Sequence, residues 1–174
     1  MRPLIIVAAL CWPTGLAQLM PQQETVTATD ACRIDRASPA LNRLEAPGTI
    51  LALADYGPEL LYRTQHGVLS IPNHRPQPGF NAGYRALTAT DLQAARAELA
   101  RHGVDWILLC PSIVERGHFT EGREGEATLY RRLLDGTAPS WLRAVGLGEE
   151  LRGSMQLFEI DPGEPATDLS TKRP

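Results

Sequence analysis

The sequence predicts an α/β domain in three layers, with a mostly parallel sheet and a C-terminal antiparallel hairpin, preceded by one N-terminal hydrophobic segment. A chain of 174 residues with 43% hydrophobic and 21% charged residues has room for one globular domain and a leader. Apolar runs of strand length alternate with segments of helical period, which is typical of a sheet covered on both faces. The last two apolar runs follow one another without a helix between them, which favours a hairpin.

The first 20 residues predict a segment that exports or anchors the chain. Arg2 is the only charged residue among the first 23, and an apolar run follows from Leu4 to Leu10. Small residues and a plausible cleavage site after Ala17 are typical of a secretory signal. The uncharged stretch is also about as long as the roughly 20 residues that cross a bilayer. Residues 1–20 are therefore a signal peptide or a single membrane span, and either one places the domain in the periplasm, free or anchored to the inner membrane.

The remaining chain divides by composition into three parts. Residues 21–31 are rich in Gln, Thr and Ala and are predicted to be a linker. Residues 32–161 hold the periodic segments and form the predicted periplasmic α/β domain. Residues 162–174 are rich in Pro, Thr and charge, which predicts a disordered tail.

The first half of the domain predicts a strand, helix, strand unit. A short helix is expected over residues 39–44, with Ser38 as N-cap and the following proline as its first residue. The continuous apolar run 49–54 predicts the first core strand. Pro58 is placed to begin a helix through Tyr62, and residues 66–72 predict a second, short strand.

The second half begins with a Pro-rich loop and a short helix around Tyr84. Thr90 and Gln93 are spaced as a capping box, so a helix is expected from there to the glycine at 103. The apolar run 104–109 follows at once and predicts a third, parallel strand.

The charged segment from Glu115 to Glu126, which includes His118, is interpreted as a solvated loop. An amphipathic helix is expected over about residues 126–134. Residues 142–147 and 155–160 then predict the two strands of the hairpin.

Two cysteines lie outside the leader, Cys32 and Cys110. An even number of cysteines in an oxidising compartment favours a disulfide. A bridge across so long a loop would stabilise the domain by on the order of 3 to 4 kcal/mol. The alternative is two unrelated buried thiols.

The most promising polar residues follow the first two strands. Asp55 and Tyr56 come directly after the first strand, and His74 and Arg75 lie in the loop after the second. The carboxyl ends of parallel strands meet at one edge of a sheet, so these side chains are expected to converge on a ligand site. The group suits a phosphate or a sugar, or acid-base chemistry with His74 titrating near neutrality. The alternative is structural: Asp55 caps the next helix, Tyr56 packs, and Arg75 pairs with Asp55.

Several classes of function lack their sequence signature. The four histidines have no metal-ligand spacing, so no metal site or other cofactor is predicted. The chain has no Gly-rich phosphate loop after a strand and no Gly-x-Ser-x-Gly motif. A net charge of −3 argues against a nucleic-acid partner.

Five segments resemble the carboxy-terminal soluble domain of bacterial inner-membrane proteins related to the C-type, polyprenyl-phosphate-sugar-dependent glycosyltransferases. They are Ala31-Cys32-Arg33, Leu53-Ala54-Asp55-Tyr56-Gly57-Pro58, Thr64-Gln65-His66-Gly67-Val68, Pro72-Asn73-His74-Arg75 and Gly103-Val104-Asp105-Trp106-Ile107-Leu108-Leu109-Cys110-Pro111. Asp55-Tyr56-Gly57 also resembles the end of the Trp-Trp-Asp-Tyr-Gly motif that binds acceptor peptide in oligosaccharyltransferases. Both tryptophans are missing here, so that role is not transferred.

The resemblance implies an accessory or non-catalytic role. In that family the catalytic acid and the lipid-phosphate site come largely from membrane helices, and this chain has at most one span. The implied partners are the inner membrane or a multi-span membrane protein, and a polyprenyl-linked sugar. Two other functions remain open: a small secreted hydrolase of a sugar or phosphate ester, with His74 and Asp55 as acid and base, and a periplasmic binding or interaction module.

Overall fold

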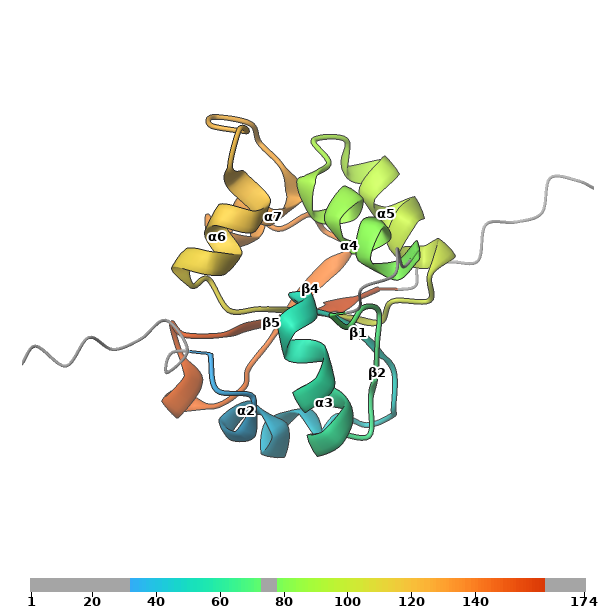
Figure 1. Ribbon diagram of the computed structural model, residues 1–174, viewed down its shortest axis with the longest axis vertical. Helices are drawn as coiled ribbons and strands as arrows, with labels where there is room; N and C mark the ends of the chain where they lie inside the picture. Colours follow the sequence, from blue (N-terminus) through green and yellow to red (C-terminus); the bar gives the residue numbers. More distant parts are fainter. Residues whose placement is uncertain (1–31, 73–77, 162–174) are drawn as a thin grey trace, which may run out of the picture.

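The computed structural model describes residues 32–72 and 78–161. Within these residues one mixed sheet has five strands in the order β2-β1-β3-β5-β4 (Figure 1). The strands are β1 Thr49–Leu51, β2 Gly67–Val68, β3 Trp106–Leu109, β4 Leu142–Val145 and β5 Gln156–Ile160. β1 pairs in parallel with β2 and β3, whereas β5 pairs antiparallel with β3 and β4. The predicted α/β class is confirmed.

Helices cover both faces of the sheet (Figure 1). The described helices are α2 Ile34–Leu41, α3 Gly57–Arg63, α4 Pro78–Thr88, α5 Leu92–Arg101, α6 Ile113–Thr120 and α7 Leu129–Leu134, with 3-10 turns η1 Ala54–Tyr56 and η2 Glu149–Leu151. Helices α4 to α7 pack on one face and α2 and α3 on the other, so the sheet separates two hydrophobic cores.

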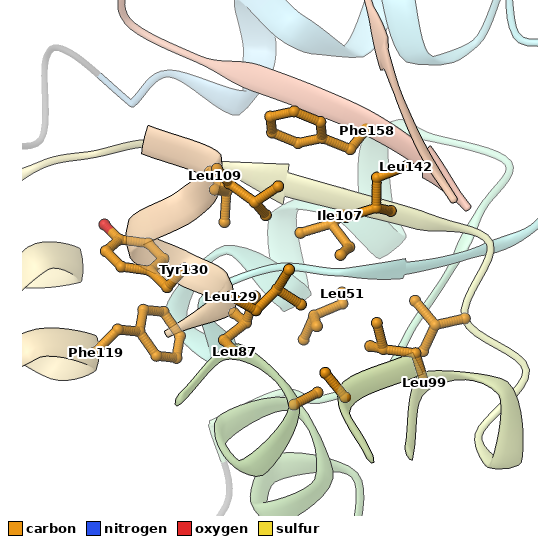
Figure 2. Close-up of a cluster of buried hydrophobic side chains, with 14 of the residues drawn as sticks. Leu51, Leu87, Leu99, Ile107, Leu109, Phe119, Leu129, Tyr130, Leu142 and Phe158 are labelled. Carbon is orange, nitrogen blue, oxygen red and sulfur yellow. The ribbon is translucent and has the colours of Figure 1, made fainter. Parts of the chain in front are cut away.

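Side chains along the central strands alternate between the two cores. Leu51, Ile107 and Leu109 belong to the core under α4 to α7, which Figure 2 shows in detail. Ile50 and Leu108 belong to the core under α2 and α3. Successive strand side chains point to opposite faces, so a strand covered on both sides is apolar throughout. This explains the continuous apolar runs in the sequence.

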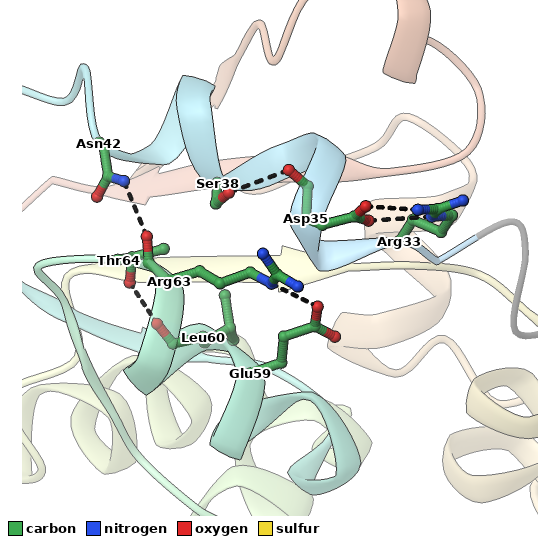
Figure 3. Close-up of polar contacts among 8 residues, drawn as sticks. All are labelled: Arg33, Asp35, Ser38, Asn42, Glu59, Leu60, Arg63 and Thr64. Carbon is green, nitrogen blue, oxygen red and sulfur yellow. Dashed lines mark hydrogen bonds and ion pairs between the residues drawn. The ribbon is translucent and has the colours of Figure 1, made fainter.

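The first helix differs from the prediction. Helix α2 begins at Ile34, before the predicted start, and Pro39 lies inside it. A proline has no N–H for the carbonyl oxygen four residues earlier, which is that of Asp35. The Ser38 hydroxyl donates a hydrogen bond to this oxygen at 3.1 Å and replaces the missing donor (Figure 3).

The cap of α5 also differs by one residue from the prediction. The carboxylate of Asp91 accepts hydrogen bonds from the backbone N–H groups of Gln93 and Ala94, at 2.8 and 3.2 Å. Thr90 is therefore not the N-cap. The helix itself and its buried residues, Ala95 and Leu99, are as predicted.

The expectation of a solvated loop at residues 115–126 is wrong over its first half. Helix α6 occupies this segment, with Ser112 as N-cap, and its Glu115 and Phe119 side chains are buried. The charges suggested solvent exposure, but Glu115 finds its polar partners inside the protein. Helix α7 in turn begins at Leu129 and is shorter than predicted.

A disulfide joins Cys32 to Cys110, with 5.6 Å between the two Cα atoms. It connects the start of α2 to the end of β3, in agreement with the pairing that the sequence favours.

The predicted leader, linker and tail lie outside the described residues. Within residues 32–72 and 78–161 no helix is both long enough and apolar enough to span a bilayer.

Candidate functional site

Asp55 and Tyr56 lie at the carboxyl edge of the sheet, where the sequence places them. The 3-10 turn η1 follows β1 and is closed by a hydrogen bond from the Tyr56 N–H to the Leu53 carbonyl at 2.9 Å. Asp55 is exposed and Tyr56 is half-buried. The turn after β1 therefore presents a carboxylate to solvent at this edge.

His74 and Arg75 lie outside the described residues, so their convergence with Asp55 stays a prediction. The structural alternative is met only in part. Tyr56 does pack, against both cores. The residue that precedes α3 is Tyr56 and no side chain caps this helix, so Asp55 is not its cap.

The structure brings three further polar residues close to Tyr56: Ser112, Glu115 and Tyr130. Together the four form what we call the carboxyl-edge cluster. Burial raises the pKa of Tyr56, the Ser112 hydroxyl opposes that rise, and the charge of Glu115 adds to it.

Glu115 is the centre of this cluster and is fully buried. One carboxyl oxygen accepts a hydrogen bond from the Cys110 N–H at 3.0 Å, and the other accepts one from the Tyr130 hydroxyl at 3.1 Å. Burial raises the pKa of Glu115 to about 7, against the opposing effect of these two hydrogen bonds. Burial, followed by the charge of Glu115, raises the pKa of Tyr130.

A carboxyl group that titrates near neutral pH is suited to proton transfer. Glu115, however, has both oxygens bound by protein groups and no exposed surface. A hollow at the same edge, lined by Ala54, Phe80 and His118 among others, has a volume of about 10 Å³, close to that of one water. Glu115 therefore joins β3, α6 and α7 inside the protein.

The sequence carries a signal for Glu115 that the prediction of a solvated loop did not include. Ser112 and Glu115 have the Ser-x-x-Glu spacing of a capping box, and Ser112 is the third residue after β3. Ser112 accepts the Glu115 N–H at 3.1 Å, as that motif requires. The Glu115 side chain departs from the motif, because it binds the Cys110 N–H in place of the N-cap N–H.

Two histidines have structural contacts that the sequence did not predict. His118 lies on α6 and its ring contacts Tyr84 and Phe119, at 5.4 and 4.7 Å between ring centroids. His66 is buried: its Nδ1 accepts the Gly48 N–H at 3.1 Å, and its Nε2 donates to the Leu41 carbonyl at 2.9 Å. The described part of the chain has no group of three or more side chains that could hold a metal ion.

Two larger cavities lie away from the predicted site. One of about 610 Å³ is lined mainly by apolar and glycine residues of the β4–β5 segment and α7. The other, of about 430 Å³, lies at the amino edge of the sheet beside Asp105 and Trp106. Neither is lined by Asp55, Tyr56 or Glu115.

Comparison with solved structures finds a similar fold in the C-terminal globular domain of an oligosaccharyltransferase from Archaeoglobus fulgidus. The TM-score is 0.52 at 16% sequence identity, and the match covers 73% of this chain and 95% of that domain. No protein-family model matches the chain. No curated protein matches it either. The two domains therefore share a fold.

Proposed function

We propose that this protein is an accessory, non-catalytic domain of a membrane glycosyltransferase system, held at the periplasmic face of the inner membrane by residues 1–20. The observation that carries the proposal is the structural match, which spans 95% of a domain that belongs to an oligosaccharyltransferase. The sequence segments that resemble glycosyltransferase-related membrane proteins support the same proposal.

The enclosed position of Glu115 supports an accessory role. Among the described residues, Glu115 is the carboxyl group with a pKa near neutrality, and it is enclosed by its own hydrogen bonds. In the proposed system the transfer reaction belongs to a multi-span partner that handles the polyprenyl-linked sugar.

We further propose that Asp55, Tyr56, His74 and Arg75 form a polar ligand site for a sugar or phosphate group. Support comes from the position of Asp55, which is exposed at the carboxyl edge where α/β sheets bind ligands. In the sequence, residues 73–77 lie between α4 and β2, which is the neighbour of β1 in the sheet.

A turnover assay tests the non-catalytic role against the secreted-hydrolase alternative. The full chain is incubated with p-nitrophenyl phosphate and with p-nitrophenyl glycosides. We expect no release of nitrophenol above the rate without protein. Turnover that is abolished by His74→Ala, with an unchanged melting temperature, would establish the hydrolase and overturn the proposal.

A further inference from the structure

The chain enters the domain at the carboxyl edge of the sheet. Cys32 is the first described residue and is joined by the disulfide to Cys110, directly after β3. A disulfide holds the two Cα atoms 5.6 Å apart, so this entry point is covalently fixed to the sheet. Any membrane attachment through residues 1–20 therefore reaches the domain beside the end of β3.

An exposed apolar pair lies next to this entry point. Ile113 and Val114 begin α6, three and four residues after Cys110, and are 83% and 58% exposed. The start of α2 and the start of α6 lie on the same side of the molecule in Figure 1. Ile113 and Val114 are neighbours in the sequence, and both are more than half exposed. No other two consecutive large hydrophobic residues in the described part of the chain are both exposed to this extent.

The opposite face of α6 explains why this pair cannot turn inward. Glu115 and Phe119 occupy the buried face of the helix, where Glu115 is held by Cys110 and Tyr130. The Ser112 cap fixes the first turn. Ile113 and Val114 are thus held outward by the same contacts that anchor the helix.

A basic residue accompanies the apolar pair. Arg116 lies on the same turn, and its Nε donates a hydrogen bond to the Pro111 carbonyl at 3.0 Å. Apolar side chains beside an arginine are typical of segments that lie in the interface of a bilayer, where the apolar groups enter the acyl boundary and the guanidinium stays among the headgroups.

We infer that Ile113 and Val114 are the membrane-contacting residues of the domain and insert into the headgroup and acyl boundary of the bilayer that holds residues 1–20. This inference rests on the proposed function, because it requires membrane attachment. Two side chains bind a bilayer weakly by themselves, but a tether turns the contact into an intramolecular one with a high effective concentration. The eleven residues of segment 21–31 can span at most about 40 Å. The entry point at Cys32 therefore stays close to the membrane surface.

Photo-crosslinking in membranes tests the contact. p-Benzoylphenylalanine replaces Ile113 in the full chain, expressed in a Gram-negative host, and the membranes are irradiated. The matched control carries the same group at Tyr62, which is 85% exposed in the last turn of α3. Tyr62 lies toward the amino edge of the sheet, since the neighbouring Arg63 carbonyl binds Asn42 at the end of α2 (Figure 3).

We expect the intact mass of the chain labelled at 113 to increase by the mass of one phospholipid, with at least about ten-fold less of this adduct at 62. Equal lipid labelling at both positions would overturn the inference and leave the proposed function standing. So would crosslinking from 113 to a second copy of this chain or to another membrane protein. A chain that is missing from the membrane fraction would instead refute the proposed attachment, and the inference with it.

Discussion

At the residue scale, the buried carboxyl group of Glu115 makes stability depend on pH. Its pKa is raised from 4.5 to about 7 in the folded protein. The folded state therefore binds this proton more tightly than the unfolded state. The stability that it contributes is fully present below about pH 4.5 and is lost as the pH rises through about 7, by on the order of 3 kcal/mol.

The Glu115→Gln variant removes this titration and keeps a hydrogen-bonding side chain of the same shape. We expect its urea unfolding free energy to fall less than that of the wild type between pH 5.5 and pH 8. Glu121→Gln is the control, because Glu121 is exposed at the end of α6. The same pH slope in the Glu115→Gln variant and in the wild type would contradict this role of Glu115.

The buried imidazole of His66 provides a second test at this scale. It satisfies the Gly48 N–H and the Leu41 carbonyl, and so ties the start of β1 to the end of α2. His66→Leu leaves both groups without their partner and should cost about 2–4 kcal/mol in chemical unfolding. Gln65→Ala, on the neighbouring exposed side chain, should change stability by less than about 0.5 kcal/mol. A loss below about 1 kcal/mol in the His66→Leu variant would refute the structural role.

Single residues were predictable where a strand end positions them. The placement of Asp55 and Tyr56 follows from the end of the first apolar run. The burial of Glu115 does not follow from any local pattern of apolar residues, because a charged side chain is expected in solvent. Its partners, Cys110 and Tyr130, become neighbours only when α6 and α7 pack on the sheet.

At the scale of the elements, the disulfide holds α2 to the end of β3. The two cysteines are 78 residues apart, and the bridge removes much of the freedom of the unfolded chain between them. The double variant Cys32→Ala, Cys110→Ala should therefore unfold with a free energy lower by about 4 kcal/mol under non-reducing conditions. Cys11→Ala serves as the control and should leave this value unchanged. Two titratable thiols at positions 32 and 110 in the exported wild type would contradict the bridge.

Close packing of α4 against the β2 end depends on Gly79. A Cβ atom at this position would meet the Leu69 carbonyl oxygen closer than non-bonded atoms can approach. Gly79→Ala should therefore shift α4 and destabilise the domain by about 1–3 kcal/mol. Gly117→Ala is the matched control, because Gly117 lies inside α6 with nothing near its missing Cβ.

The control variant should be more stable than the wild type by up to about 1 kcal/mol, because alanine favours the helix. Thermal unfolding of both variants measures the difference. A Gly79→Ala variant as stable as Gly117→Ala would show that α4 does not pack this closely.

Elements were predictable where one local signal dominates. The strand predicted at 104–109 is present as β3 and the helix before it as α5, although the cap of α5 is Asp91 and not Thr90. The predicted start of α2 is wrong because a proline usually marks the first turn of a helix. Pro39 lies inside α2, where the Ser38 hydroxyl replaces the missing N–H donor. The prediction is wrong at α6 because the charged residues suggested a solvated loop. Ser112 and Glu115 nevertheless have the spacing that begins a helix.

At the scale of the whole molecule, the order of apolar runs is enough to predict an α/β sheet with a parallel centre. It is not enough to predict which helices share a face, since that depends on how β1, β3 and β5 come together. The likeness to an oligosaccharyltransferase domain covers 73% of this chain and gives this fold a structural precedent.

We propose that the domain works while attached to the inner membrane. Membrane fractionation and intact mass of the full chain, expressed in a Gram-negative host without reducing agent, test this attachment. We expect a product that retains residues 1–20, is found in the membrane fraction, and contains the Cys32–Cys110 bridge. A product released into the periplasm after cleavage near Ala17 would contradict it.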